Sequence, residues 1–245
     1  MKILTIDIGG TNVKILATGQ AARRKFPSGQ TLTARQMVSK VKRYARDWQY
    51  DAISIGYPGK VWHGQAVAEP RNLAPGWVGF DFSAAFECPV KLMNDAAMQA
   101  LGSYKGGTML FLGLGTGLGA TLVVDGIVLS MEWGQLSYEK GTIEDYVGTR
   151  GLKRLGKKKW TRHVTRGIAR MIKTFHVDDV VVGGGNAKKL KYLPHGCRLG
   201  HNANAFQGGF RMWEEDSDLQ PSSAASRTVG TGLVRNEMPY RWRVA

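Results

Sequence analysis

The chain has few cysteines and no long apolar runs. Only Cys88 and Cys197 occur among 245 residues, and they lack the CxxC spacing. This argues against a disulfide framework and against a structural zinc cluster. The longest apolar runs, at 109–112 and 122–124, fall far short of the ~20 residues that span a bilayer. A strand-like stretch follows Met1 directly. We therefore expect no signal peptide, no membrane partner and a cytoplasmic location.

Proline and acidic residues are also scarce. Eight prolines and a hydrophobic content of 43% indicate a folded globular chain. Its length accommodates one large core or two lobes of about 100–150 residues. The 19 acidic residues against 34 basic ones give a formal charge of +15. Such a surface attracts polyanions such as nucleic acid, an acidic membrane or polyphosphate, although it also simply keeps a protein soluble.

The first sixteen residues contain two apolar runs joined by Asp7-Ile8-Gly9-Gly10-Thr11-Asn12. They predict a β-hairpin with a Gly-Gly turn. The glycines let backbone N–H groups approach an anion, and Thr11 and Asn12 add donors. Asp7, in an apolar strand, is costly to bury unless it meets a cation or several donors. A carboxylate beside a phosphate-sized hollow suits Mg²⁺-dependent phosphoryl transfer, but an ordinary hairpin explains this stretch equally well.

Residues 108–124 repeat this design, with Gly115, Thr116 and Gly117 in a glycine-rich turn between two apolar runs. We interpret the two segments as a duplicated unit that begins each of two lobes. Two such turns facing one cleft can hold both sides of a phosphate chain. A third glycine-rich segment, at 183–186, follows a predicted strand at 179–182 and leads into a predicted helix at 187–191. Its N–H groups would face a phosphate or a nucleotide.

A predicted strand at 90–93 runs into Asn94 and Asp95, and a predicted helix follows at 96–104. A carboxylate at such a junction is open to a ligand. The alternative is that Asp95 only caps the helix.

Residues 131–147 predict a glycine-punctuated loop rich in polar side chains. Glu132, Gln135 and Glu144 suit hydrogen bonding to a hydroxyl-rich ligand. For Glu139 and Asp145, a solvated surface is the preferred interpretation.

Residues 150–175 predict the longest helix, with a break near Gly156. Basic side chains recur every fourth residue and so share one stripe: Arg154, Lys158, Arg162, Arg166 and Arg170. Like charges at this spacing repel by about 0.2–0.5 kcal/mol per pair, so a bound anion would relieve the repulsion. A solvated face remains the alternative for each residue.

The remaining elements follow from periodicity and turn residues. We expect a polar connection at 19–30, a helix at 31–48 with Thr33 as its N-cap, a strand at 51–55, a hairpin at 61–69 and a short helix at 82–86. A helix at 202–213 returns to the first lobe, and a disordered tail occupies 214–245.

With these pieces placed, the chain resembles the ROK group of sugar kinases, within the larger actin-like ATPase fold. Their polyphosphate glucokinase branch is the most similar. Eight motifs carry the resemblance in the family's order, from residue 1 to about 213: 7–12, Asn94-Asp95, 113–119, 132–138, 140–148, 150–160, 183–189 and 202–206.

The resemblance implies an α/β protein with a two-lobed, actin-like ATPase (ribonuclease H-like) fold and an interlobe cleft. Residues 1–95 would form a small N-terminal lobe on the sugar and phosphate side, completed by the helix near 202–213. Residues 96–201 would form the larger C-terminal lobe. The implied reaction transfers a phosphoryl group from polyphosphate, ATP or both to the 6-hydroxyl of glucose, with Mg²⁺. A homodimer without nucleic-acid partners is expected.

The resemblance also assigns roles to residues. Asp95 would be the general base, while Asn94, Glu132, Glu144, Gln135 and Asn72 would contact the sugar. Asp7 would orient the metal, usually through water. The phosphate-binding set would be Asp7, Gly9, Gly10, Thr11, Asn12, Lys14, Gly115, Thr116, Gly117, Gly183, Gly184, Gly185 and Asn186.

Two departures from the family pattern matter. Gln135 stands where the family has the histidine of Glu-x-Gly-His, and an amide keeps hydrogen bonds but cannot titrate. Sugar choice is therefore open, and mannose or an amino sugar is an alternative to glucose. The cysteine-rich zinc loop of many relatives is missing, so no structural zinc is expected. A sugar-binding or polyanion-binding protein with weak catalysis is a second alternative.

Overall fold

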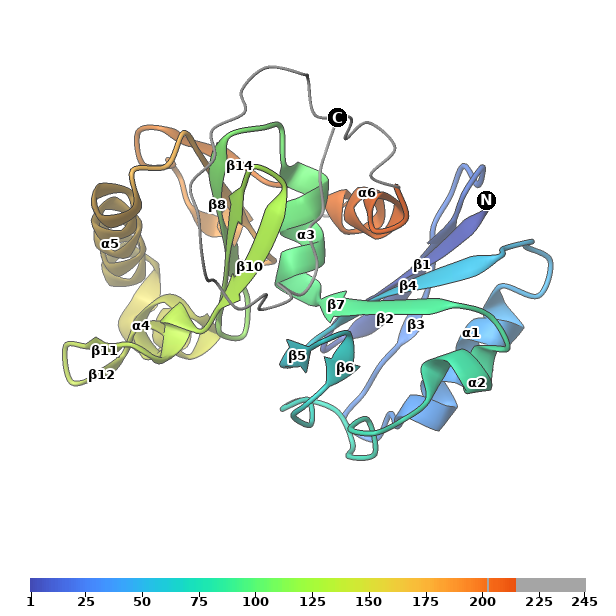
Figure 1. Cartoon of the computed structure of the whole chain (residues 1–245). Helices are drawn as coiled ribbons and strands as arrows, with labels where there is room; N and C mark the ends of the chain where they lie inside the picture. Colours follow the sequence, from blue (N-terminus) through green and yellow to red (C-terminus); the bar gives the residue numbers. More distant parts are fainter. Residues whose placement is uncertain (202, 215–245) are drawn as a thin grey trace, which may run out of the picture.

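The computed structural model describes residues 1–201 and 203–214. Two five-stranded sheets stand on either side of a pair of helices, α3 (Asp95–Ser103) and α6 (Asn204–Arg211) (Figure 1). None of the helices in this described part is both long and apolar enough to cross a membrane.

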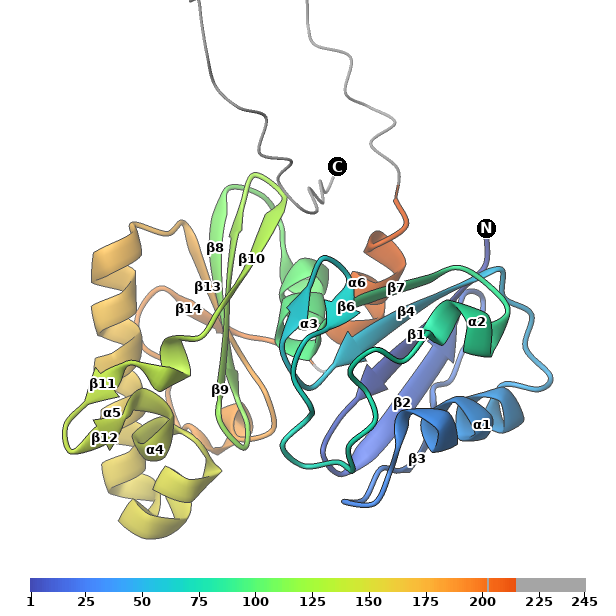
Figure 2. The ribbon, with the colours of Figure 1, turned by 60° about the horizontal axis from the view of Figure 1, so that its bottom comes forward.

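The first sheet has the order β3-β2-β1-β4-β7. It consists of β1 (Ile3–Ile8), β2 (Asn12–Ala17), β3 (Arg24–Pro27), β4 (Ala52–Tyr57) and β7 (Val90–Asn94). The first three strands are antiparallel neighbours, and β4 and β7 continue the sheet in parallel with β1. Helices α1 (Ala34–Tyr44) and α2 (Phe82–Phe86) lie on one face, and α6 lies on the other (Figure 2). All of β1 and β4 is therefore buried.

The alternation of side chains along β1 decides what each face carries. Leu4, Ile6 and Ile8 join the core beneath α1. Thr5 and Asp7 point to the opposite face, where Thr5 lies against Gly209 of α6. Asp7 is thereby directed toward the side of the sheet on which α3 begins.

The second sheet has the order β10-β9-β8-β13-β14 and repeats the pairing of the first. It consists of β8 (Thr108–Leu114), β9 (Leu118–Val124), β10 (Ile127–Met131), β13 (Asp179–Gly183) and β14 (Cys197–Leu199). Again, two antiparallel pairs are followed by two parallel ones. This topology confirms the duplicated unit predicted from the two glycine-rich hairpins.

Helix α5 (Thr149–Phe175) and helix α3 sandwich the second sheet. Leu110, Leu112 and Leu114 of β8 pack toward α5, and Met109 and Phe111 pack toward α3. The predicted break in α5 is confirmed, since Gly156 has φ 72° and ψ 160°. The smaller elements lie at the edges: β5 (Val61–Trp62), β6 (Gln65–Ala66), β11 (Ser137–Tyr138), β12 (Gly141–Thr142), α4 (Ile143–Val147) and the 3₁₀ turns at 133–135 and 187–189.

Helices α3 and α6 cross with their backbones in contact. A side chain on Gly102 would collide with the carbonyl of Asn204, and one on Gly208 would collide with the carbonyl of Met98. Ser54 fixes α6 to the first sheet by donating to the Gly209 carbonyl. The helix expected at 202–213 thus exists at 204–211 and returns to the first sheet. The lobe boundary at residue 95 stays a prediction, because α3 contacts strands of both sheets.

Several expectations were wrong in detail. Strand β3 lies within the supposed connection at 19–30, where Phe26 is buried although Arg24 and Lys25 precede it. The supposed loop at 131–147 contains β11, β12 and α4. The helix expected at 187–191 is only a 3₁₀ turn, and α1 ends at Tyr44 rather than at 48. Position 202, and the tail predicted at 214–245 beyond its first residue, lie outside the described residues.

Candidate active site

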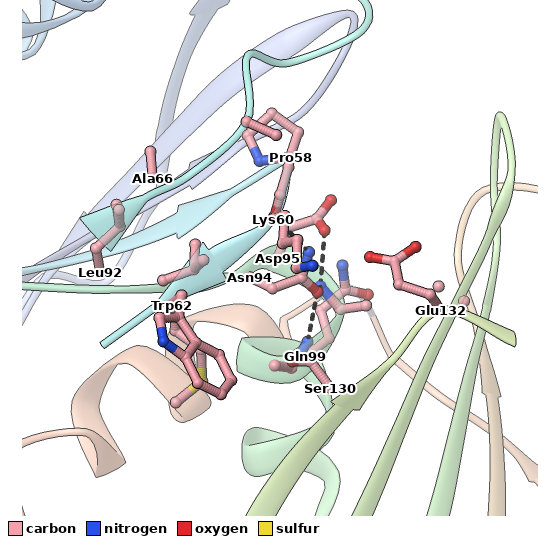
Figure 3. A pocket seen from close by; sticks show the side chains of 18 of the residues that line it. Pro58, Lys60, Trp62, Ala66, Leu92, Asn94, Asp95, Gln99, Ser130 and Glu132 are labelled. Atoms are coloured by element: carbon pink, nitrogen blue, oxygen red, sulfur yellow. Dashed lines mark hydrogen bonds between the residues drawn. The ribbon is translucent and has the colours of Figure 1, made fainter. Parts of the chain in front are cut away.

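A cleft of about 1700 Å³ opens between the two sheets. Residues from both sides line it, and Figure 3 shows Asn94 and Asp95 on one wall with Glu132 directed toward them from the other. The predicted site residues that line the cleft are Gly9, Gly10, Asn72, Asn94, Asp95, Gly115, Thr116, Gly117, Glu132, Gln135, Glu144, Gly184 and Gly185.

Asn94 and Asp95 have different roles at the start of α3. The Asn94 Oδ1 accepts hydrogen bonds from the backbone N–H groups of Ala96 (3.0 Å) and Ala97 (3.2 Å), and Nδ2 donates to the Gly59 carbonyl at 3.0 Å. Asn94 is therefore the N-cap, and the interpretation of Asp95 as only a cap is wrong. The Asp95 Oδ1 also accepts from the Ala96 N–H at 2.8 Å, and the carboxyl lines the cleft.

The surroundings of Asp95 suit a proton acceptor. Burial, and secondarily the negative charge of Asp7, raise the pKa of Asp95 to about 7. The Ala96 N–H and the positive charge of Lys14 oppose this shift. A carboxyl whose pKa lies near neutral pH can accept a proton and release it again. Perturbed carboxyls in clefts are typical of functional sites.

Asp7 does not line the cleft but lies behind it. It is 5% exposed, and its Oδ2 accepts from Lys14 Nζ at 2.7 Å. The pair forms because Asp7 on β1 and Lys14 on β2 are directly opposite in the hairpin. Lys14 thus supplies the cation that a buried carboxylate requires. Thr11 and Asn12 also stand outside the cleft lining. Their carbonyls accept from the N–H groups of Ser28 and Gly9 and so brace the turn.

The charges around Asp95 fit a small hard cation. Two carboxylates, Asp7 and Asp95, interact there with a single lysine, which leaves a surplus of negative charge and oxygen donors. Mg²⁺ is typically held by one or two carboxylates together with water and phosphate oxygens. Within residues 1–201 and 203–214, no cluster of three or more His, Cys, Asp or Glu side chains forms a complete protein-only metal site.

The second glycine-rich turn is held from behind. The Gly115 carbonyl accepts from Thr149 Oγ1 and from Asn186 Nδ2, both at 2.9 Å. Asn186 is 6% exposed and outside the cleft lining, so its side chain braces the turn. Gly183 is also outside the lining, against Phe111. Gly184 has φ +82°, and a side chain there would meet the Leu114 carbonyl, so glycine is needed for this close approach.

Glu144 connects the turn at 115–117 with the polar wall of the cleft. Its Oε2 lies against Gly117 and Gly134, where any side chain would crowd it. Its Oε1 accepts from Arg71 Nη1 at 2.9 Å. Glu132, just before the 3₁₀ turn at 133–135, and Gln135, at its end, are exposed and also line the cleft. In the described part of the chain, no cation pairs with Glu132.

The basic stripe is not continuous and does not line the cleft. The kink at Gly156 interrupts the helical period between Arg154 and Lys158, so the four-residue spacing does not place them on one row. Arg154 lies over the Tyr146 ring and donates to the Asp145 carbonyl. Arg166 pairs with Glu139 at 2.8 Å. Lys158 and Arg162 are exposed on the part of α5 after the kink.

The sequence analysis missed several residues that line the cleft, among them Lys60, Trp62, Arg71 and Arg150. Trp62 is 59% exposed on the β5–β6 hairpin. Arg71 precedes Asn72 in its loop, and Arg150 begins α5 beside the turn at 115–117. The only signals available were that Arg71 adjoins the predicted site residue Asn72 and that Arg150 begins the motif at 150–160.

Comparison with known proteins supports a common origin. Residues 3–136 match the ROK family. The polyphosphate glucokinase of Mycobacterium tuberculosis (strain CDC 1551 / Oshkosh) is 25% identical over 216 aligned residues, in a match that covers 77% of this chain and 80% of that protein. The kanosamine kinase of Amycolatopsis mediterranei (strain S699) is 28% identical over 172 aligned residues, in a match that covers 60% of this chain and 56% of that protein.

Among solved structures, the inorganic polyphosphate/ATP-glucomannokinase from Arthrobacter sp. strain KM is similar to this chain. Its TM-score is 0.72 at 22% identity, and the match covers 84% of this chain and 96% of that one. The fold is therefore the two-lobed, actin-like ATPase fold, with the cleft between its lobes. Since the family match takes in more than half of its residues, the chain belongs to the ROK family.

Proposed function

We propose that this ROK-family sugar kinase, a phosphotransferase, transfers a phosphoryl group from polyphosphate, ATP or both to the 6-hydroxyl of glucose. The observation that carries the proposal is the carboxyl of Asp95, which faces the cleft with its pKa raised to about 7. Similarity to a polyphosphate glucokinase and to a polyphosphate/ATP-glucomannokinase supports the donor and the acceptor.

Asp95 would act as the general base. As the acceptor oxygen attacks the terminal phosphorus, its proton passes to the Asp95 carboxylate, and the bond from phosphorus to the leaving oxygen breaks. Asn94 supports this role, because it caps α3 and leaves one Nδ2 hydrogen for a neighbouring hydroxyl. The base must be ionised, so activity should fall as the pH drops below about 7.

The two glycine-rich turns would hold the transferred phosphoryl group and the rest of the donor. Gly9 and Gly10 approach from the first sheet, and Gly115 to Gly117 approach from the second. Backbone N–H groups fixed before the reaction stabilise developing negative charge without rearranging. Asp7 would orient Mg²⁺, usually through water, while Asp95 stays free to accept the proton. When bound, this ion neutralises charge on the donor phosphates.

Acceptor recognition would come from Glu132, Gln135, Glu144 and Asn72. All four line the cleft. Carboxylates accept hydrogen bonds from hydroxyls, and the Gln135 amide both donates and accepts. An amino hexose is a second candidate acceptor, because no described cation neutralises Glu132 and an ammonium group could do so. The similarity to a kanosamine kinase supports this alternative.

Polyphosphate is favoured as a donor by the charge of the chain. The net charge is +15, and Lys158, Arg162 and Arg166 are exposed on α5. Arg150, at the start of the same helix, lines the cleft and is 82% exposed. A long polyanion could follow these residues out of the cleft, as linear polyanions follow basic surfaces.

The experiment that tests the proposal measures sugar phosphate formed by the purified chain with Mg²⁺. Polyphosphate and ATP are supplied separately, each with glucose, mannose and a 3-amino or 2-amino hexose at equal concentration. We expect glucose 6-phosphate with at least one donor. A higher kcat/KM for an amino hexose than for glucose would identify the amino hexose, instead of glucose, as the acceptor. Turnover of no sugar with either donor, together with salt-sensitive sugar or polyanion binding, would favour a binding protein instead.

A further inference from the structure

One ion pair crosses the cleft. Arg71 belongs to the loop between β6 and α2, on the side of the first sheet, and Glu144 belongs to α4, on the side of the second. The Arg71 Nη1 lies 2.9 Å from the Glu144 Oε1. The other ion pairs between residues in 1–201 and 203–214 each join two residues on the same side. Among the described residues, the Arg71–Glu144 ion pair is therefore the one that joins the two sides of the cleft.

The two partners are not equally fixed. The Glu144 side chain is 21% exposed, and its second oxygen lies against Gly117 and Gly134. The capping box of Thr142 and Asp145 further holds the start of α4. The Arg71 side chain is 74% exposed and reaches across from a loop. The carboxylate is thus the more closely packed partner, and the arginine is the more exposed one.

The loop that carries Arg71 also carries Asn72. The Asn72 side chain lies near Gly10 of the first glycine-rich turn, since a methyl group on Gly10 would be 3.8 Å from it. The ion pair of Arg71 therefore also restrains the segment that carries Asn72, a proposed sugar contact. Both residues line the cleft, as does Glu144.

We propose that Arg71 is a positioning residue that ties the two lobes around the acceptor sugar. It occupies one oxygen of Glu144 and leaves the other, beside Gly117 and Gly134, to accept from a sugar hydroxyl. A carboxylate can accept several hydrogen bonds, so the sugar and Arg71 share Glu144 rather than compete for it. The inference rests on the proposed function, because it takes Glu144 as a sugar contact.

This role acts on binding and not on phosphoryl transfer. Arg71 bonds to Glu144 and makes no hydrogen bond or ion pair with Asp95 or residues 115–117 of the described chain, so its loss should raise the KM for the sugar and leave kcat nearly unchanged. Loss of an ion pair of such exposure should raise the KM for the sugar by about two- to fivefold. Salt should weaken it, because screening acts on exposed charges.

The test compares the wild type with Arg71→Ala and Arg71→Lys. Lys42→Ala is the matched control, since Lys42 forms an exposed ion pair with Glu87 far from the cleft. Sugar binding is measured by calorimetry without donor at low and high salt, and KM and kcat are measured with the working donor. We expect Arg71→Ala to weaken binding at low salt to the level that the wild type shows at high salt. Arg71→Lys should recover part of the loss, and Lys42→Ala should match the wild type.

Equal or tighter sugar binding by Arg71→Ala would overturn the inference, and tighter binding would make Arg71 an inhibitory contact. A fall in kcat without a change in KM would also contradict it. X-ray scattering of the sugar-free proteins gives an independent readout: Arg71→Ala should be more open than the wild type at low salt. If the wild type phosphorylates no sugar, the proposed function fails, whereas the scattering result still tests the tie between the lobes.

Discussion

Replacing Asp95 with asparagine is expected to stabilise the folded chain at neutral and alkaline pH, although it removes the proposed base. The pKa of this carboxyl is about 7 in the folded chain and 3.8 for the free group. Between these values the folded state binds more protons than the unfolded state. The free energy of unfolding therefore falls as the pH rises from about 4 to 7 and is then level. An asparagine carries no such titration.

The size of this effect on the free energy of unfolding follows from the difference between the pKa of Asp95 in the folded chain and that of the free group. About three pKa units correspond to about 4 kcal/mol at 1.36 kcal/mol per unit. Because Asp95 lines an open cleft that admits water, we expect about half of this, ~2 kcal/mol. The free energy of unfolding of Asp95→Asn should thus exceed that of the wild type by about 2 kcal/mol at pH 8. The two values should be about equal near pH 4.

Urea unfolding followed by tryptophan fluorescence, at several pH values, measures this difference. Asp145→Asn is the matched control, because hydrogen bonds from Thr142 lower the pKa of Asp145. That carboxylate stabilises the fold above its unfolded pKa, so its removal should destabilise the protein at pH 8. If the wild type loses no more stability than Asp95→Asn between about pH 5 and 8, the environment assigned to Asp95 is wrong.

Further expectations concern the helix crossing and the buried ion pair. Gly208→Ala should cost about 1–3 kcal/mol in thermal or urea unfolding, because its methyl group would collide with the Met98 carbonyl. Gly167→Ala, a helical site with no atom near the added methyl, should be neutral or stabilising by up to about 1 kcal/mol, and an equal loss at both sites would contradict the close crossing. Lys14→Met should move the acidic limb of the pH–rate profile to higher pH, since Lys14 lowers the pKa of Asp95. Asp7→Asn should move that limb to lower pH, since Asp7 raises the pKa of Asp95. If both variants move the limb in the same direction, the assigned effects of Lys14 and Asp7 on Asp95 are wrong.

The sequence predicted the two glycine-rich hairpins and the strand-to-helix junction because each is a local pattern. Thr33 is an example: the sequence predicts it as the N-cap of α1, and the structure confirms that role. Gly156 likewise breaks α5 where a single glycine suggested a break.

What the sequence did not predict depends on contacts between distant segments. The burial of Phe26 in β3 comes from packing beneath α1, which periodicity within 19–30 does not reveal. Asn186 was expected to face a phosphate, but its amide braces Gly115, 71 residues away. The pairing of Arg71 with Glu144 depends on how the two sides of the cleft approach each other. Such partners are decided by tertiary structure and leave no local signature.

The most direct test of the central claim, that Asp95 is the general base for sugar phosphorylation, is the activity of Asp95→Asn with the best donor and sugar. The variant should bind the sugar within about a few-fold of the wild type, since the cap on Asn94 and the glycine-rich turns remain. Its kcat should fall by about 10²–10⁴-fold or more, the typical contribution of a positioned base. Undiminished turnover in a correctly folded Asp95→Asn protein would contradict the account.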